Sequence, residues 1–154
     1  MFPEMRRKDR QLSQEETVRV LESALYGTIS TVNADGWPYA VPIDFVYADG
    51  KLYFHGARDG AKLQNFRRNN RVCFSAVASA QTVPEQFSTR YASAVVFGHV
   101  SELDGEEKQA ALLRLIEKYC PDHLEQGRDY VRREMETTAA FAVSIEHMTG
   151  KARK

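Results

Sequence analysis

The stretch from Tyr39 to Lys62 carries strand and turn signals in an order that fits a hairpin leading into a helix. From Val41 to Tyr47 apolar residues recur at every second position, the period of a strand with one buried face. Asp49-Gly50 follows, and this dipeptide favours a two-residue type I′ turn because both central residues of that turn need positive φ. Lys51 to His55 is then predicted to return as a second strand.

The end of this stretch has the residues of an anion site. Gly56, Gly60 and Lys62 stand where the returning strand gives way to a helix. Unpaired N–H groups at a helix N-terminus attract negative charge, and a nearby cation strengthens that attraction. Lys62 is either a phosphate ligand or an ordinary helix-face lysine. Three roles are possible for His55: it could donate a hydrogen bond to a cofactor, serve as an axial metal ligand, or simply end the strand. It is the one candidate for a catalytic role.

Six strands are predicted in the whole chain. A second Asp-Gly pair, Asp35-Gly36, joins a strand at 28–32 to the strand that begins at Trp37, so three strands meander through two hairpins. Gly98 indicates a bulge or a close backbone approach. The polar segment 79–91 is predicted to be a long loop. The remaining strands are expected at 71–78, 92–103 and 141–146, followed by a basic tail.

Helices are predicted to flank these strands. Ser13 and Glu16 form a capping box that starts the first helix, and Gly27 suits a left-handed stop after it. Further helices are expected at 61–69, from Asp104 to Tyr119 and at 124–136. This pattern predicts a mainly β fold with flanking helices, a six-stranded antiparallel barrel that is closed or nearly so. Side chains fill so small a barrel, so a ligand would sit on its surface or in a groove between subunits, which favours a homodimer.

Composition narrows the function classes. The 154 residues suit one domain, predicted at 13–154 behind a basic arm at 1–12. Lys plus Arg and Asp plus Glu both number 21, which argues against a general nucleic-acid binder. No apolar run is long enough for a membrane span and no secretory signal core is present, so we expect a cytoplasmic protein. Cys73 and Cys120 lack metal or redox spacing, and no metal site is predicted.

One resemblance covers nearly the whole chain. The run VPIDFVY…GKLYFHGARDGAKLQNFRRNNRVCF resembles the FMN-binding split-barrel proteins related to pyridoxamine 5′-phosphate oxidase. The segments MRRKDRQL, VPEQFSTRYASAVVFGHV and IEHMTGKA resemble in particular the nitroimidazole-resistance (Nim) branch. The resemblance implies a split-barrel homodimer with two FMN sites at the subunit interface, and an FMN-dependent oxidoreductase.

The resemblance also implies a set of site residues. Val41, Pro42, Ile43 and Asp44 would run along the isoalloxazine ring and Lys62 would bind the phosphate. His55, Gly56 and Ala57 would lie near the cofactor, and the partner chain would close the site with Tyr91, Ser93 and Phe97. Family members carry Gly-His-Lys at the phosphate turn, whereas this chain has Gly60-Ala61-Lys62, so an imidazole contact is missing there.

The implied chemistry passes electrons from NAD(P)H through FMN to a small-molecule acceptor, as a Nim-like nitroreductase would. The alternative is a non-catalytic flavin- or haem-binding protein on the same fold, with His55 as the haem ligand. Pyridoxamine phosphate oxidation itself is disfavoured, because the C-terminal Lys151-Ala152-Arg153-Lys154 is a poor match for the substrate-binding segment. A deazaflavin in place of FMN stays open.

Overall fold

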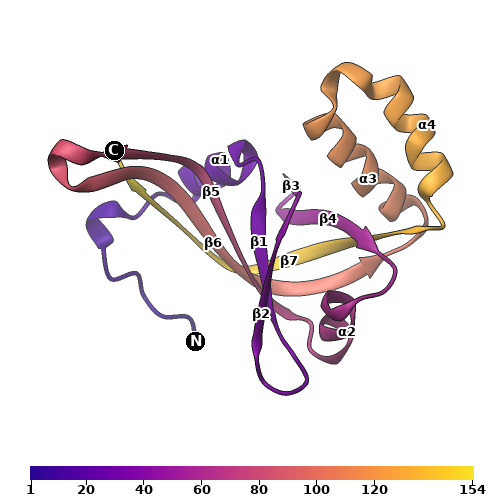
Figure 1. Ribbon diagram of the computed structural model, residues 1–154, viewed down its shortest axis with the longest axis horizontal. Helices are drawn as coiled ribbons and strands as arrows, with labels where there is room; N and C mark the ends of the chain where they lie inside the picture. The colour runs from indigo at the N-terminus through magenta and orange to yellow at the C-terminus, as the bar shows by residue number, and fades with distance from the viewer.

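The computed structural model describes all 154 residues. One antiparallel sheet of seven strands forms its body, with helices packed around it (Figure 1). The strands are β1 (Gly27–Val32), β2 (Pro38–Ile43), β3 (Val46–Ala48), β4 (Lys51–Ala57), β5 (Arg71–Val83), β6 (Ser88–Leu103) and β7 (Thr138–Arg153). The helices are α1 (Gln14–Ser23), α2 (Ala61–Arg68), α3 (Gly105–Tyr119) and α4 (Leu124–Glu134), with short 3-10 turns at Lys8–Arg10, Pro84–Gln86 and Pro121–His123.

The strand order is β2-β1-β5-β6-β7-β4-β3, so β2 and β3 lie on opposite edges of the sheet although they are consecutive in the chain. The chain crosses between the edges at Asp44 and Phe45, where Phe45 is fully buried. The mainly β architecture with flanking helices is confirmed. The count of six strands was wrong, because this crossover divides one predicted strand into β2 and β3. The sheet is open rather than closed, and β2 pairs with β1 but not with β4.

The long loop predicted at 79–91 is instead the end of a two-stranded hairpin. β5 and β6 stay paired to Val83 and Ser88, and only Pro84–Phe87 form the turn. Most side chains in this segment are small or polar because both faces of the hairpin end are open to solvent. An apolar alternation was therefore missing from the sequence, although the strand itself is present.

The C-terminal tail is also strand rather than an irregular extension. β7 continues from Thr138 to Arg153, seven residues beyond the predicted end at Glu146. Gly98 opposes it at the bulge that the sequence predicts, since the register with β7 shifts between Phe97 and Gly98. A Cβ at Gly98 would stand 2.3 Å from the Ser144 carbonyl oxygen, so the close backbone approach is confirmed as well.

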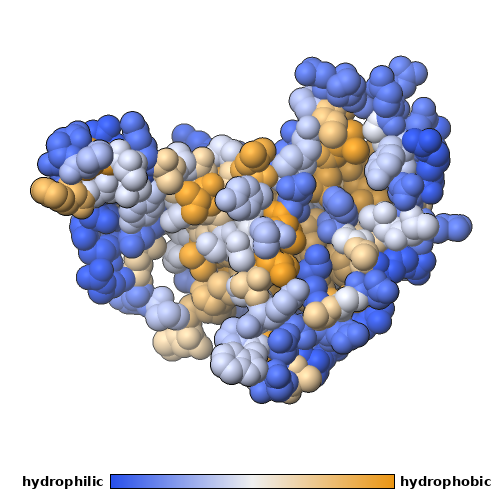
Figure 2. All heavy atoms as spheres, viewed as in Figure 1, coloured by the Kyte–Doolittle hydropathy of each residue, from blue (hydrophilic) through white to orange (hydrophobic).

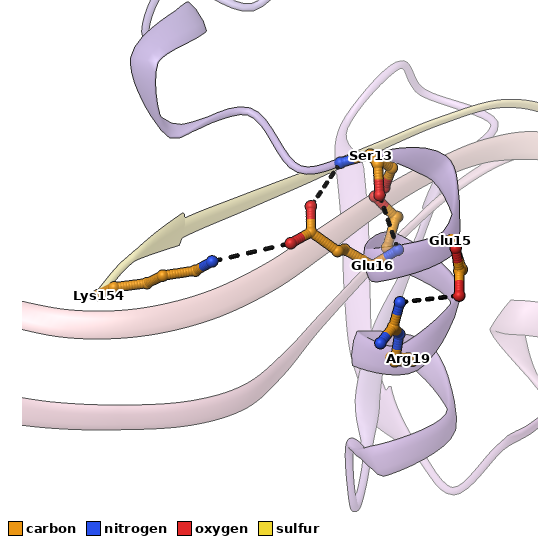
Figure 3. Close-up of polar contacts among 6 residues, drawn as sticks. Ser13, Glu15, Glu16, Arg19 and Lys154 are labelled. Carbon is orange, nitrogen blue, oxygen red and sulfur yellow. Dashed lines mark hydrogen bonds and ion pairs between the residues drawn. The ribbon is translucent and has the colours of Figure 1, made fainter.

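The capping box at the start of α1 is confirmed (Figure 3). The Glu16 N–H donates to Ser13 Oγ at 3.1 Å, and the Ser13 N–H donates to the Glu16 carboxylate at 2.9 Å. The predicted stop at Gly27 was wrong, because α1 ends at Ser23 and Gly27 begins β1. Gly27 is needed there for space, since a Cβ would stand 2.1 Å from the Phe74 ring. The other three predicted helices are confirmed to within two residues of each end.

Two apolar clusters hold the fold together. The larger lies inside the curved sheet, where Phe45 packs edge-on against Phe74 at 4.7 Å and Phe54 stacks on Phe141 at 5.1 Å between ring centroids. Truncating a ring of this kind to alanine typically costs about 3–5 kcal/mol. The smaller cluster lies beneath α3 and α4, where apolar side chains gather in Figure 2. The two clusters cover both faces of the β4–β7 pair.

The N-terminal arm is docked on the sheet. The Phe2 ring stacks on His147 with 4.8 Å between centroids and an interplanar angle of 3°. Farther along, the Leu12 N–H donates to the Gly150 carbonyl at 2.9 Å. Across the chain, no helix has the length and apolar character needed to cross a bilayer.

Candidate functional site

The end of β4 and the start of α2 bring Gly56 and Lys62 together. Side chains alternate along β4, so Phe54 and Gly56 face the interior of the curved sheet while His55 faces the opposite side. A Cβ at Gly56 would stand 3.2 Å from Lys62 Nζ, so the missing side chain leaves room for the lysine. Lys62 is half-buried and no acidic group pairs with it; burial alone lowers the pKa of its ammonium. The result is a partly desolvated cation without a counter-charge.

The N-terminus of α2 adds hydrogen-bond donors beside this cation. Gly60 precedes the helix with φ of 118°, a conformation that favours glycine, and no side chain caps the helix there. The first intrahelical bond in this turn runs from the Gln64 N–H to the Gly60 carbonyl. The preceding N–H groups of the first turn are therefore free to bind an anion, as the sequence predicts.

A buried polar cluster fixes α2 against β1. Asn65 is 3% exposed and its Nδ2 donates to Thr31 Oγ1 at 2.9 Å and to Asn33 Oδ1 at 2.8 Å. Arg68 in turn donates to Asn65 Oδ1 at 2.7 Å. Sequence reasoning missed Asn65, because an asparagine between apolar helix positions carries no signal of its partners. The cluster sets the position of the helix that carries Lys62.

A second anchor holds the Asp44–Phe45 crossover. The Phe45 N–H donates to Tyr119 Oη at 2.9 Å, and Lys118 Nζ donates to the carbonyls of Phe45 and Ala24, both at 2.8 Å. Burial is the main cause that lowers the pKa of the Lys118 ammonium and raises the pKa of the Tyr119 phenol. Both residues lie at the end of α3, and no local pattern predicts that they reach the crossover. They fix the backbone at Asp44.

His55 lies on the other side of β4 from Lys62, at the edge of a pocket between α3 and α4. This pocket has a volume of about 90 Å³, too small for a flavin, and is mostly apolar. Burial against it lowers the pKa of the His55 imidazole, with Asp44 acting in the opposite direction and Lys62 in the same one. This shift favours the neutral form of the ring. The residues that line the pocket are His55, Leu112, Leu115, Ile116, Tyr130, Val131, Glu134 and Thr138.

The segment predicted to run along a flavin ring presents two kinds of surface. Ile43 is buried in the core and Val41 packs against it, so these two residues offer only backbone groups. Pro42 and Asp44 are exposed. Ala57, at the end of β4, is exposed as well. The charges of Asp44 and Lys62 both act on the pKa of the His55 imidazole, so these residues lie in one part of the molecule, and with their neighbours on β2 and β4 they form the first group of predicted site residues.

Tyr91, Ser93 and Phe97 form a second group, on the outer face of β6. Ser93 pairs with Lys151 on β7, whereas Gly56 pairs with Ala139 on the same strand. These two β7 positions are twelve residues apart, which is about 40 Å of strand at about 3.3 Å per residue. One chain therefore keeps Gly56 and Lys62 apart from Ser93, whereas Pro42 lies three strands from Val95 through Thr28 and Ser75.

The N-terminal arm partly covers this second group. Phe2 contacts the Phe97 ring with 4.9 Å between centroids. Beneath the arm is a hollow of about 320 Å³ that Pro3 and Met5 share with Ser93 and Phe97. The aromatic and hydroxyl side chains that the sequence predicts for a ring-binding surface thus share one groove.

The chain thus combines an open antiparallel sheet with flanking helices, a helix N-terminus beside an unpaired lysine, and a separate groove that suits a ligand. The family model for pyridoxamine 5′-phosphate oxidase matches residues 13–152. The chain belongs to this family. A comparison with curated proteins found no match.

Solved structures resemble the chain over most of its length. One, from Bacteroides thetaiotaomicron, is provisionally described as a 5-nitroimidazole antibiotic resistance protein; it is 25% identical, with a TM-score of 0.76 over 92% of this chain and 86% of its own. An FAD- and haem-binding protein from Mycobacterium smegmatis is 25% identical, with a TM-score of 0.81 over 94% and 74%. An FAD-binding protein from Mesorhizobium loti is 25% identical, with a TM-score of 0.66 over 94% and 98%. Family and neighbours together support a flavin-binding protein.

Proposed function

We propose that this protein is an FMN-dependent oxidoreductase that takes electrons from NAD(P)H and delivers them to a small acceptor, as a Nim-like nitroreductase would. One observation carries the proposal: Lys62 is a half-buried cation without an acidic partner, beside the uncapped N-terminus of α2. A flavin phosphate is dianionic and suits such a pocket. Gly56 supports it, because a larger residue there would crowd Lys62.

The residues of this chain would bind and orient the cofactor. Lys62 and the first-turn N–H groups of α2 would hold the phosphate, and the β2 backbone from Val41 to Asp44 would lie along the ring. A bound FMN would supply the redox chemistry, accepting a hydride from the nicotinamide and reducing the acceptor. The lowered pKa of His55 favours its neutral form, so it would serve as a hydrogen-bonding group rather than as a fixed charge.

We further propose that the active form is a homodimer in which the second group of site residues closes the partner's flavin site. The separation of about 40 Å of strand between Gly56 and Ser93 supports this, because a single chain cannot use Lys62 and Ser93 at one ligand. The outer face of the sheet supports it too, since ten positions of β1, β2, β5 and β6 on that face carry no charged side chain although 27% of the chain is charged. Those positions are Thr28, Ser30, Ala40, Pro42, Cys73, Ser75, Val77, Ser93, Val95 and Phe97.

Lys62→Gln tests the phosphate contact. Removing the charge should weaken FMN binding by about tenfold or more, since a charge-assisted hydrogen bond is worth about 1.5–3 kcal/mol. Quenching of flavin fluorescence on titration with FMN measures the affinity. Lys51→Gln is the matched control: Lys51 is an exposed lysine at the other end of β4, and its loss should leave the affinity unchanged. Equal FMN affinities in the two variants would show that Lys62 does not bind the flavin phosphate.

The alternative function, haem or flavin binding without turnover, has one observation in its favour. The lowered pKa of the His55 imidazole favours its neutral form, and iron ligation requires a neutral imidazole. Addition of haem to the purified protein separates the two functions. A Soret band that disappears in His55→Ala would favour haem binding, whereas bleaching of bound FMN by NADH or NADPH without oxygen would favour the oxidoreductase.

A further inference from the structure

A basic hollow of about 440 Å³ lies at the end of the molecule that carries the chain termini. The N-terminal arm, the start of α1 and the last residues of β7 enclose it, and the C-terminus lies beside the β5–β6 hairpin, far from α2 (Figure 1). Four cationic side chains and two acidic ones line it: Arg7, Arg10, Arg153 and Lys154 with Asp9 and Glu16. In a chain without net charge this is a local positive excess.

Two of the four cations already have acidic partners. Arg7 Nε donates to Asp9 Oδ1 at 2.8 Å. Lys154 Nζ lies 3.7 Å from the carboxylate of Glu16, on the side of α1 that Figure 3 shows. These pairs account for both carboxylates in the hollow, so the positive excess belongs to the other two cations.

Arg10 and Arg153 have no carboxylate partner. Arg10 Nη1 lies 3.5 Å from the Tyr91 hydroxyl, and Arg153 Nη2 donates to the Gln86 amide oxygen at 3.4 Å. Tyr91 pairs with Arg153 across β6 and β7. Lys151 is a third cation without an acidic partner, and its Nζ lies 5.8 Å from the centre of the Tyr91 ring. Three unneutralised cations therefore surround one phenol.

Backbone contacts fix this arrangement. Arg10 ends a 3-10 turn, and Gln11 next to it forms a bridge to Lys151 on β7. The residue after that, Leu12, is hydrogen-bonded to Gly150. The arginine is thus held over the sheet rather than on a free tail, which lowers the entropy cost of using it to bind a ligand. The Arg10 contact is also the main cause that lowers the pKa of the Tyr91 phenol.

We propose that this hollow binds the phosphate group of a small anionic ligand, with the Arg10 and Arg153 guanidinium groups and the Tyr91 hydroxyl as its hydrogen-bond donors. Planar guanidinium forks match the geometry of phosphate oxygens. Two forks and a phenol together supply more hydrogen-bond donors than one side of a carboxylate can accept. Lys151 adds charge without a fixed direction. Within one chain this site lies at the other end of β7 from the flavin phosphate proposed at Lys62. Tyr91 also belongs to the group proposed to close the partner's flavin site, so phosphate binding is tested both with and without FMN.

Calorimetric titration with inorganic phosphate and pyrophosphate at low ionic strength tests the site. The titration is done in two proteins. The first is full-length Lys62→Gln, in which the proposed flavin-phosphate site is removed, and the second is wild type saturated with FMN. Both should bind phosphate, and adding Arg10→Gln or Arg153→Gln should weaken that binding by about tenfold each. Arg6→Gln, an exposed arginine of the same arm, should change it by less than about twofold.

Acetate separates phosphate from carboxylate chemistry, and it should bind at least about tenfold more weakly than phosphate. Circular dichroism of the arginine variants without ligand should match that of the parent, because both side chains lie at the surface. Absence of phosphate binding in both backgrounds, or equal affinity in the Arg10, Arg153 and Arg6 variants, would overturn the proposal. Loss of FMN binding in Lys62→Gln concerns only the flavin proposal and leaves this result unaffected.

Discussion

The candidate site residues predicted from the sequence lie in different local environments. Lys62 and His55 are both partly desolvated, but they lie on opposite sides of β4 because side chains alternate along a strand. Of the residues expected near one ligand, Gly56 therefore lies on the Lys62 side of β4 and His55 on the other side. Lys118 shows the opposite case, since an unremarkable helix-end lysine holds two backbone carbonyls at the crossover.

The lowered pKa of His55 leads to a prediction about acid stability. The folded state disfavours the protonated imidazole, so the unfolded chain binds the proton at higher pH. The free energy of unfolding is therefore undiminished by His55 above the pKa that this residue has in the unfolded chain, about 6.5. Part of that free energy is lost as the pH falls through the lower pKa that His55 has in the folded protein. His55→Gln should lose less stability than wild type between about pH 7.5 and about pH 5, measured by urea unfolding at each pH. His123→Gln, at an exposed histidine, is the control; a wild-type decline no steeper than that of His55→Gln would contradict the prediction.

Secondary-structure elements were predictable in kind, and much less so where their boundaries depend on tertiary contacts. The apolar alternation from Val41 runs through Ile43 and Phe45 to Tyr47 without interruption, so nothing local marks the crossover at Asp44. The break exists because Lys118 and Tyr119 of α3 bind the backbone there. The hairpin end at 79–91 is the reverse case, a paired strand whose solvated faces give no periodic signal.

The anchor of α2 gives a prediction at Asn65. Asn65→Ala would remove three side-chain hydrogen bonds and leave the buried Thr31 hydroxyl without this partner, so the free energy of unfolding should fall by about 2–4 kcal/mol. Gln64→Ala, at an exposed position of the same helix, should change it by less than about 0.5 kcal/mol. Urea unfolding measures both. A similar loss in the two variants would mean that the cluster does not hold the helix.

The hairpin turn gives another prediction, at Phe87. This residue is 98% exposed and adopts φ of 49°, so its ring gains nothing from packing while its backbone is in the left-handed region. That conformation costs a non-glycine residue about 1–2 kcal/mol. Phe87→Gly should therefore raise the free energy of unfolding by about 0.5–1 kcal/mol after the entropy cost of glycine, while Phe87→Ala should not. Equal effects of glycine and alanine in urea unfolding would show that the turn is unstrained.

For the molecule as a whole, the sequence was enough to identify the family, the mainly β architecture and the strand–glycine–lysine segment beside α2. It could not reveal that the predicted site residues form two groups. That division follows from the lengths of β6 and β7. The length of β7 could not be predicted because its second half is a basic stretch without an apolar alternation. Open edges, an outer face of β1, β2, β5 and β6 with few charges and the separation of Lys62 from Ser93 all fit a shared site between two chains.

Subunit mixing with FMN titration tests that shared site most directly. Lys62→Gln should damage the first group, and the double variant Ser93→Leu/Phe97→Ala should damage the second, so each protein alone should bind FMN poorly. After the two are mixed and allowed to exchange, half of the dimers should carry one of each chain and one intact site, which restores about a quarter of all sites. Fluorescence titration should find this fraction with wild-type affinity. A mixture that binds no more FMN than its separate components, while mixed wild-type chains exchange freely, would contradict a flavin site built from two chains.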